Sequence, residues 1–330
     1  MRDNHRKMPR RRDFIRILGA GAVAAGTSLG ARAQDVYPSR PITLIVPWTA
    51  GGGSDGAMRV FAQIATKYLK QTVVIENIAG ASGTLGPARM ARTAKPDGYT
   101  LSQIPAGIFR LPAMHKTDWD PQKDFDYIAR IAGYQGIFVV RADSPIKTLN
   151  DLITFAKAHP GEVTYGSVGV GTGNHLNVAE FGLKAGLELT HVPYKGSSES
   201  LTALLGGHVM LVSSESAGSY IVSGKVRALA VTNEKRLSRF PDIPTLHELG
   251  YGGALNSSYG WAGPAGMDPK IVAYLDGITK KVTEDPEFIE AMVKFDQVIA
   301  YLNTADYNAS ISRELAAGRR LIEALGLVEK

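Results

Sequence analysis

The sequence predicts an α/β protein with mainly parallel sheets, arranged as two lobes. Short apolar runs end in Gly-rich turns and are followed by segments with apolar residues at helical spacing, and this order recurs along the chain. About 300 residues follow a basic N-terminal segment, which is enough chain for two ordinary hydrophobic cores. The sequence contains no Cys, which excludes disulfides, thiolate metal ligands and a Cys nucleophile.

The N-terminal segment, residues 1–33, is expected to be a removable export signal. The Arg pair in residues 11–15 resembles a twin-arginine motif, and a Gly- and Ala-rich apolar stretch follows at 17–29. Small residues at 31–33 predict cleavage before Gln34. A membrane anchor is the alternative, but the apolar stretch is shorter than the roughly 20 residues that span a bilayer. We therefore expect a periplasmic protein.

The basic net charge of +6 comes from this segment. Its eight Lys or Arg and two Asp, removed from totals of 37 and 31, leave 29 of each sign in the rest of the chain. The expected mature protein is formally neutral, so its composition does not support nucleic-acid binding or attraction to a membrane surface.

The first expected elements alternate between strand and helix. An apolar run ends at a Gly-rich turn, and a helical pattern with Met58, Phe61, Ile64 and Leu69 on one face follows. The elements expected here are a strand at 42–47, a helix at 56–70, a strand at 73–76, a helix through about residue 93 and a strand at 99–104.

The middle of the chain repeats this design between two expected crossings from lobe to lobe, at 138–141 and 259–264. Between them we expect a helix from Thr148 to Pro160, strands at 164–167, 189–192, 208–213 and 228–232, and a helix at 174–185. Helices at about 269–283 and 305–325 complete the chain.

Four strand-to-helix junctions are rich in Gly, Ser, Thr and Asn: 49–55, 79–84, 167–174 and 194–198. Such turns bring backbone close to a ligand and leave the first N–H groups of a helix without partners, which favours an anion. Helix capping alone is the simpler interpretation of any one junction. Four junctions at the carboxyl ends of strands together indicate a carboxylate or phosphate site.

Other chemistry finds little support in the sequence. Residues 51–54 lack the tail of a phosphate-binding loop, and residues 166–171 lack both the dinucleotide fingerprint and the spacing of a nucleophile elbow. His175, His191 and His208 have no metal-ligand spacing. Glu180 and Glu215 are the residue type of an acid–base pair, but nothing in the sequence brings them together. We expect no catalysis, metal or cofactor.

The turns lie within longer stretches that resemble the Bug family, the solute receptors of tripartite tricarboxylate transporters. The stretches occur in the family's order and cover nearly the whole expected mature chain. They are Pro41–Asp55, Glu76–Gly83, Lys95–Leu101, Asp120–Phe125, Gly166–Glu180, His191–Gly196, Arg227–Thr232 and Pro241–Thr245.

The resemblance implies a type II periplasmic-binding-protein fold, with two α/β lobes joined by a two-strand hinge and a ligand cleft between them. Residues 34–137 and 260–330 would form the first lobe, and residues 138–259 the second. Such a protein would bind a small carboxylate, such as an aromatic or dicarboxylic acid, and deliver it as a monomer to membrane subunits of the transporter. Signalling to a sensor kinase is an alternative output, and a periplasmic hydrolase or isomerase is a weaker one.

The resemblance also implies which residues bind. Backbone amides and ordered water in the Gly-rich loops would hold the carboxylate, at Thr49, Ala50, Gly51, Gly52, Ser54 and Ser82, facing Ser167, Gly169 and Thr172 in the other lobe. Trp48 would form a wall for a flat acid. Positions that vary between such receptors would set selectivity: Ala106, Phe109, Tyr134, His175, Tyr194 and Glu215. Arg110 is a candidate partner for a second carboxylate, and Asp55 is interpreted as fixing its loop.

Two features depart from the family pattern. Met210 stands where we expect Asp, which puts any polar role of that position in doubt. The turn at 213–216, Ser-Ser-Glu-Ser, is unusually polar and suggests a ligand that bears a hydroxyl or an amine.

Overall fold

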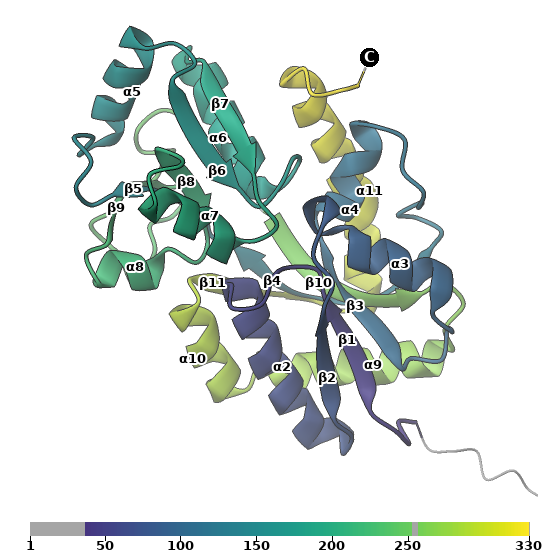
Figure 1. Ribbon diagram of the computed structural model, residues 1–330. Coiled ribbons are helices and arrows are strands. Elements are labelled where there is room, and N and C mark those ends of the chain that lie inside the picture. Colours follow the sequence, from purple (N-terminus) through teal and green to yellow (C-terminus); the bar gives the residue numbers. More distant parts are fainter. Residues whose placement is uncertain (1–36, 253–256, 330) are drawn as a thin grey trace, which may run out of the picture. The chain divides into compact units, whose positions relative to one another are not determined.

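The computed structural model describes residues 37–252 and 257–329. The expected export signal, residues 1–33, lies outside these residues. Within the described part the chain forms two α/β lobes, each built around its own sheet (Figure 1). The two-lobe α/β fold predicted from the sequence is confirmed. The expected mainly parallel sheets are wrong, because both sheets are mixed and the strands next to the crossings, β4, β5 and β10, pair antiparallel with their neighbours.

The first lobe contains a six-stranded mixed sheet in the order β11-β4-β10-β3-β1-β2. Its strands are β1 (Ile42–Val46), β2 (Val73–Asn77), β3 (Thr100–Pro105), β4 (Phe125–Tyr134), β10 (Ser257–Pro264) and β11 (Gln297–Leu302). β1 pairs in parallel with β2 and β3, whereas β10 is antiparallel to β3 and β4, and β11 is antiparallel to β4. The carboxyl ends of the three parallel strands therefore lie at one edge of the sheet.

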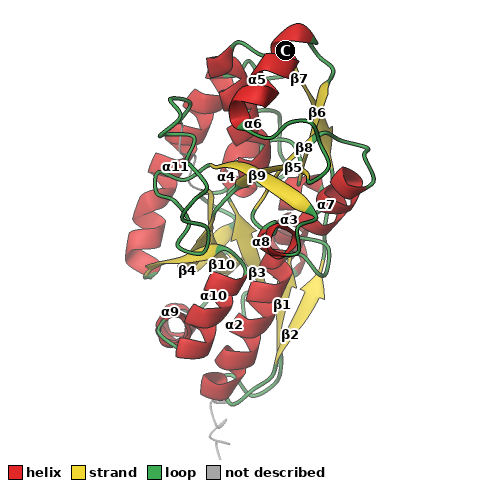
Figure 2. Ribbon diagram, turned by 90° about the vertical axis from the view of Figure 1, so that its left-hand side faces the viewer, coloured by secondary structure: helices red, strands yellow, loops and turns green. Residues whose placement is uncertain are grey.

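The helices of the first lobe cover both faces of this sheet. They are α2 (Gly53–Leu69), α3 (Leu85–Thr93), α4 (Gly107–Arg110), α9 (Pro269–Thr283), α10 (Pro286–Lys294) and α11 (Thr304–Ala324), with 3-10 turns η1 (Ala81–Gly83) and η2 (Leu111–Ala113). α2 and α10 lie side by side (Figures 1 and 2). α2 buries the apolar face predicted from the sequence, and Phe61 packs edge-on against Trp261 and Phe288 at centroid distances of 5.2 and 5.9 Å.

The second lobe contains a five-stranded sheet in the order β7-β6-β8-β5-β9. Its strands are β5 (Ile137–Arg141), β6 (Val163–Ser167), β7 (Leu189–Pro193), β8 (Leu211–Ser214) and β9 (Val226–Val231), and its helices are α5 (Leu149–Ala158), α6 (Gly173–Ala185), α7 (Ser197–Leu205) and α8 (Gly218–Val222). Thr148 and Asp151 form a capping box that starts α5, as their spacing predicts. Phe138 of β5 packs edge-on against Phe181 of α6 in the core.

Two stretches of chain cross between the lobes. The first lies between β4 and β5, and the second lies between β9 and β10. They are joined to each other, because the amide of Thr232 donates a hydrogen bond of 2.9 Å to the carbonyl of Gly136. The first crossing spans only residues 135–136, whereas residues 232–252 of the second stay against the second lobe, where the amide of Leu246 donates a hydrogen bond of 2.8 Å to the carbonyl of Val231. Two neighbouring crossings are typical of a hinge about which two lobes rotate.

The lobes also meet along a seam of small residues. Thr49 Oγ1 lies 3.4 Å from Ser198 Oγ, and the amide of Gly53 donates to Ser216 Oγ at 2.8 Å. At Gly196 the fit is tighter, because a Cβ added there would lie 2.2 Å from Thr49 Oγ1. The seam in this conformation therefore requires a glycine at position 196.

An ion pair bridges the lobes beside this seam. Arg239 Nη1, which follows β9, lies 3.1 Å from Asp296 Oδ1, which precedes β11. Asp296 is buried, and burial raises its pKa above the ordinary value although Arg239 and the Gly218 amide lower it. The pair lines a cavity of about 350 Å³ together with Gly51 and Gly52.

Candidate functional site

A small cavity lies between the lobes, where the carboxyl ends of the first-lobe strands face the start of α6. Its enclosed volume is about 30 Å³. The first lobe contributes Trp48, Ser82, Pro105, Ala106, Gly107, Arg110, Tyr134 and Ser257, and the second contributes Val168, Thr172, Gly173, Asn174 and Glu215. Seven of these were predicted from the sequence: Trp48, Ser82, Ala106, Tyr134, Thr172 and Glu215 as binding residues, and Arg110 as a candidate partner for a second carboxylate.

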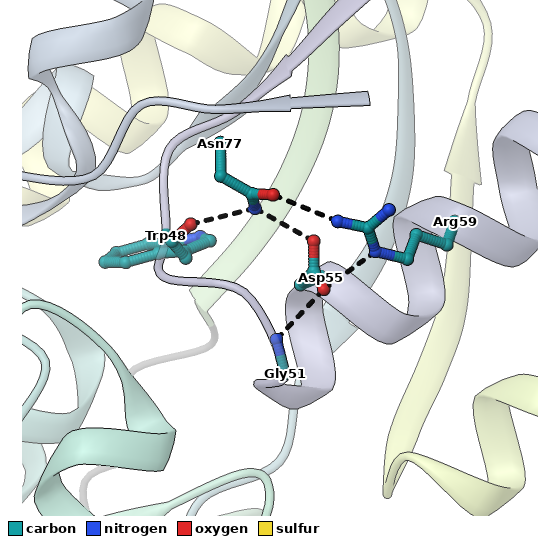
Figure 3. A network of polar contacts seen from close by, with 5 residues as sticks. All are labelled: Trp48, Gly51, Asp55, Arg59 and Asn77. Atoms are coloured by element: carbon teal, nitrogen blue, oxygen red, sulfur yellow. Dashed lines mark hydrogen bonds and ion pairs between the residues drawn. The ribbon is translucent and has the colours of Figure 1, made fainter. Parts of the chain in front are cut away.

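The loop after β1 is held by a polar network around Asp55 (Figure 3). The Asp55 carboxylate accepts hydrogen bonds from the Gly51 amide at 3.0 Å, Arg59 Nε at 2.9 Å and Asn77 Nδ2 at 2.8 Å. Asn77 Nδ2 also donates to the carbonyl of Trp48 at 3.0 Å. Burial alone would raise the pKa of Asp55, but these hydrogen bonds outweigh it and lower the pKa below its ordinary value. Asp55 therefore fixes the loop as an ionised acceptor, as predicted.

A buried hydrogen-bond cluster supports the first-lobe wall. Tyr134 OH lies 2.8 Å from Ser54 Oγ and 3.0 Å from Gln103 Nε2, which itself donates to Ser54 Oγ at 2.9 Å. Burial raises the pKa of Tyr134 above its ordinary value, so the phenol stays protonated at physiological pH. Ser54 thus lies behind Tyr134 and orients it, whereas Tyr134 lines the cavity.

Ser82 and Gly169 bring the two lobes into contact at the edge of the cavity. Ser82 has a left-handed backbone with φ of 55°, and a Cβ added at Gly169 would lie 2.6 Å from its hydroxyl. Gly169 itself has φ of 125°, a conformation that favours glycine. Gly169 is therefore required by this contact and by its own backbone.

The start of α6 forms the second-lobe wall. Thr172 caps the helix by accepting a hydrogen bond from the His175 amide at 3.4 Å, and its hydroxyl donates to the carbonyl of Gly169 at 2.7 Å. The first turn of a helix leaves backbone N–H groups without helical acceptors, and its dipole is positive at this end. This wall therefore offers donors to an anion in the cavity.

Two buried charges of opposite sign line the cavity. Arg110 Nη1 donates to Ser257 Oγ at 3.1 Å, and Arg110 is only 6% exposed. Desolvation lowers its pKa to about 10, so the guanidinium remains charged at neutral pH. Glu215, 5% exposed, accepts hydrogen bonds from Ser197 Oγ at 2.5 Å and Asn174 Nδ2 at 2.9 Å. Within residues 37–252 and 257–329, neither charge forms an ion pair.

The remaining residues that the sequence singled out lie outside the cavity lining. Thr49 lies in the seam, Gly51 and Gly52 line the cavity beside Asp296, and Ala50 lies in the exposed loop between them. Phe109 is part of the first-lobe core beside Tyr127. Tyr194 faces a separate surface groove with Ser198 and His208, and Met210 packs against the second-lobe core.

His175 and His191 stack on each other at a centroid distance of 4.1 Å. Burial lowers the pKa of His175 to about 3 and that of His191 to about 4, so both rings are neutral at physiological pH. Ser167 Oγ lies 2.6 Å from His191 Nε2, but Ser167 has no exposed surface. This pair therefore does not present a nucleophile to the cavity.

Sequence reasoning missed several lining residues. Asn174 lies at the end of a Gly-rich junction that was identified, and its amide side chain was the available signal. Ser257 is brought to Arg110 by the register of β10 against β4, which no local motif reports. In the described ranges, no helix is long and apolar enough to cross a membrane, and no cluster of three or more His, Asp or Glu is arranged to hold a metal ion.

The comparisons with known proteins agree with the fold and the motifs. Residues 57–327 match the model of the tripartite tricarboxylate transporter family receptor. A Cupriavidus necator protein described as "UPF0065 protein in gbd 5'region" is 45% identical over 97% of this chain and 99% of its own length. Protein BugT of Bordetella pertussis is 33% identical over 84% of this chain and 86% of its own.

Solved structures of the same type superpose closely. The periplasmic binding protein BugD is 30% identical with a TM-score of 0.85, covering 89% of this chain and all of BugD. The R. palustris protein Rpa4515, solved with adipate, is 28% identical with a TM-score of 0.84, covering 88% of this chain and 98% of its own. The chain therefore belongs to the tripartite tricarboxylate transporter receptor family, the Bug-type periplasmic binding proteins, as its sequence motifs indicated.

Proposed function

We propose that this protein is an exported receptor that binds a small carboxylate between its lobes and delivers it to membrane subunits of a tripartite tricarboxylate-type transporter. The observation that carries the proposal is the buried guanidinium of Arg110, which lines the cavity opposite the start of α6. Its described hydrogen-bond partner is the neutral hydroxyl of Ser257. Glu314 raises the pKa of Arg110 through space but forms no ion pair with it within the described residues, so a ligand carboxylate would supply a direct counter-charge.

The physical argument rests on the cost of burying a charge. An ionised group taken out of water is unfavourable unless it is paired and hydrogen-bonded. A guanidinium has five N–H donors arranged to match a carboxylate, and such charge-assisted hydrogen bonds are about twice as strong as neutral ones. The amides at the start of α6 add further donors to the same anion. Binding of a carboxylate here would thus convert an unfavourable burial into a favourable pair.

The size of the cavity bears on how a ligand enters. An enclosed volume of about 30 Å³ holds about two water molecules. Any carboxylic acid larger than this requires the lobes to rotate apart about the hinge and then to close around it. The seam at Thr49 and Gly196 would form again on closure. The relative solved with adipate is consistent with a carboxylate as ligand, and Trp48 and Tyr134 would provide flat apolar walls for its carbon chain.

Binding is tested by a thermal-shift screen of residues 34–330 against dicarboxylic, aromatic and amino acids. A ligand that binds only the folded protein stabilises it by about 2.7 kcal/mol at a hundredfold excess over Kd. The best ligand is then measured by calorimetry with Arg110→Gln and with the control Arg89→Gln, which alters an exposed arginine on α3. Loss of a charge-assisted pair predicts a 10- to 100-fold weaker Kd for Arg110→Gln and no change for the control.

The outcome of this screen separates the proposed receptor from other functions. Stabilisation by no acid, or equal affinity in wild type and Arg110→Gln, would contradict the carboxylate site. Chemical change of the bound acid during incubation would favour the hydrolase or isomerase alternative. Delivery is tested by deleting the gene: loss of uptake of the identified acid supports transport, whereas intact uptake with loss of an acid-induced transcriptional response supports signalling to a sensor kinase.

A further inference from the structure

Asp296 is a carboxylate of the first lobe that groups of the second lobe cover. It lies between α10 and β11, and its side chain is 2% exposed. Arg239 Nη1 lies 3.1 and 3.4 Å from its two carboxylate oxygens and donates to the carbonyl of Lys294 at 3.2 Å. A Cβ added at Gly218 would lie 1.9 Å from Asp296 Oδ2. Arg239 and Gly218 move away from the carboxylate when the lobes rotate apart, and water then reaches it.

Each side of this contact is fixed to its own lobe. The guanidinium of Arg239 lies over the Phe240 ring at 5.1 Å, and Phe240 packs against the second-lobe core. Phe295, the residue before Asp296, packs on α2, because a Cβ added at Gly56 would lie 2.5 Å from Phe295 Cζ. Asp296 has a left-handed backbone with φ of 53°, which is uncommon for a residue other than Gly and persists where the surrounding structure holds it. The distance between Arg239 and Asp296 therefore depends on the position of one lobe against the other.

The groups around Asp296 decide which of its protonation states favours closure. The cavity that it lines contains two cationic side chains, Arg239 and Lys294, and one phenol, Tyr220, and its other lining residues are uncharged. Burial raises the pKa of Asp296, and the opposing effect of Arg239 and the Gly218 amide is smaller. In the open arrangement water solvates the carboxylate, and its pKa is near the ordinary value. The closed lobes therefore bind a proton at Asp296 more tightly than the open lobes.

We propose that Asp296 and Arg239 form a pH-sensitive latch between the lobes. Protonation of Asp296 favours the closed arrangement, and Arg239 stabilises that arrangement when Asp296 is charged. The cavity beside the latch shares no lining residue with the ligand cavity, so the latch acts on closure without touching the ligand. Its effect on ligand affinity rests on the proposed receptor function, whereas its effect on the lobes does not.

The direction of the pH dependence follows from the two arrangements of the lobes. Below the ordinary pKa of Asp both arrangements carry the proton, and the contribution of Asp296 to closure is complete. This contribution is lost as pH rises through the raised pKa of the closed arrangement, and above that value it is constant. One unit of pKa difference changes the closed-to-open ratio about tenfold. We expect this ratio to fall about threefold or more between pH 4 and pH 7.

Spin labels test the lobes without any ligand. The chain contains no Cys, so Asn150→Cys on α5 and Glu290→Cys on α10, both at exposed positions, place one label in each lobe. Pulsed electron–electron double resonance on the ligand-free protein should show the expected fall in the closed-to-open ratio, and no fall when Asp296→Asn is added. Arg239→Gln should lower the closed fraction at pH 7, because it leaves a buried charge without its partner. It should have little effect in the Asp296→Asn background, where that charge is absent.

Ligand affinity provides a second measurement. Calorimetry with the acid identified by the screen should show the Kd of the wild type, divided by that of Asp296→Asn, rising about threefold or more from pH 4 to pH 7. Ionisation of the acid itself affects both proteins equally and cancels in this ratio. Arg236→Gln is the matched control, because its ion-pair partner Glu248 lies in the same lobe, and it should change neither measurement.

The outcomes separate the latch from the proposed function. Equal label distances in the wild type at the two pH values, or a pH dependence that Asp296→Asn retains, would overturn the latch and leave the receptor standing. If no acid binds, the proposed function fails, and the label distances alone decide the latch. If Asp296→Asn does not fold, an unchanged closed fraction in Arg239→Gln at pH 7 overturns it.

Discussion

The glycine at position 196 predicts how much of ligand binding depends on closure of the lobes. Its φ is −175°, an extended conformation that any residue adopts, so Gly196→Ala introduces no backbone strain. Loss of the glycine N-cap of α7 lowers the free energy of unfolding, and the lower entropy of the unfolded alanine variant raises it. Each effect is about 1 kcal/mol or less, so the two nearly cancel. The main effect is steric, because the new methyl group would lie 2.2 Å from Thr49 Oγ1 in the other lobe.

The expected magnitude follows from the cost of overpacking. Forcing one extra carbon into a packed contact costs roughly 1–3 kcal/mol, and this cost falls on the closed form alone. It therefore weakens Kd by roughly 5- to 150-fold, while the melting temperature of the ligand-free protein changes little once the lobes have opened. Calorimetry with the acid identified by the screen measures the first effect, and thermal melts measure the second.

A second substitution provides the control. Thr49→Ala removes the hydroxyl that the new methyl group meets and leaves Thr49 Cβ and N at 3.4 Å from that position, which is close to ordinary contact. The double variant Gly196→Ala with Thr49→Ala is expected to regain most of the wild-type affinity. Full affinity in Gly196→Ala alone would refute the reasoning, because it would mean that the ligand binds without the seam described here.

Three further predictions concern ionisable groups. The pKa values of His175 and His191 are lowered to about 3 and about 4, so the unfolded chain binds more protons below pH 6.5. The free energy of unfolding should therefore fall by roughly 5 kcal/mol between pH 6.5 and pH 4. Replacing both residues with Gln should flatten this dependence in urea titrations. Asp55→Ala should lower the melting temperature, because it removes the acceptor of three hydrogen bonds. Asp97→Ala, which removes an exposed ion-pair partner of Arg40, should not lower it. Equal effects of the two substitutions would contradict the role of Asp55. Burial raises the pKa of Asp296, so the stability that this shift contributes is complete below the ordinary pKa of Asp and is lost as pH rises through the raised value. The free energy of unfolding of Asp296→Asn should therefore rise relative to that of the wild type from pH 3.5 to pH 7. A constant difference between the two proteins would contradict the direction of the pKa shift.

Local patterns predicted the elements whose signal is contained in a few residues. The apolar face of α2 and the capping box of α5 were readable because helical spacing and cap chemistry are short-range properties. Five helices and strands were not predicted: α4, β4, α8, α10 and β11. β4 carries Arg130 within a mostly buried run, and its Nε donates a hydrogen bond of 2.7 Å to the carbonyl of Ala300 on β11. The hydrogen bond of the Arg130 side chain depends on strand pairing between segments that are distant in the sequence, and local sequence patterns do not predict such pairing.

The candidate site was also predicted only in part. Two of the four Gly-rich junctions, 79–84 and 167–174, contribute residues to the cavity, because turns at the carboxyl ends of parallel strands gather at one edge of a sheet, whereas 49–55 and 194–198 contribute none. Which residue within each loop lines the cavity depends on side-chain direction. Ser54 and Tyr134 illustrate this, since the two touch each other and only the second reaches the cavity. The lobe boundaries at 137 and 259 and the roles of the lining residues stay predictions.

The second lobe has a consequence for how such receptors diversify. All five of its strands lie in one uninterrupted stretch of sequence between the two crossings, and that stretch contributes Val168, Thr172, Gly173, Asn174 and Glu215 to the cavity. Recombination at both crossings would exchange these five of the thirteen lining residues together. The eight lining residues of the first lobe, including Arg110, would remain with the recipient. A lineage carrying many copies of this gene could therefore acquire new specificities by swapping one segment, without having to evolve a new counter-charge for the carboxylate each time.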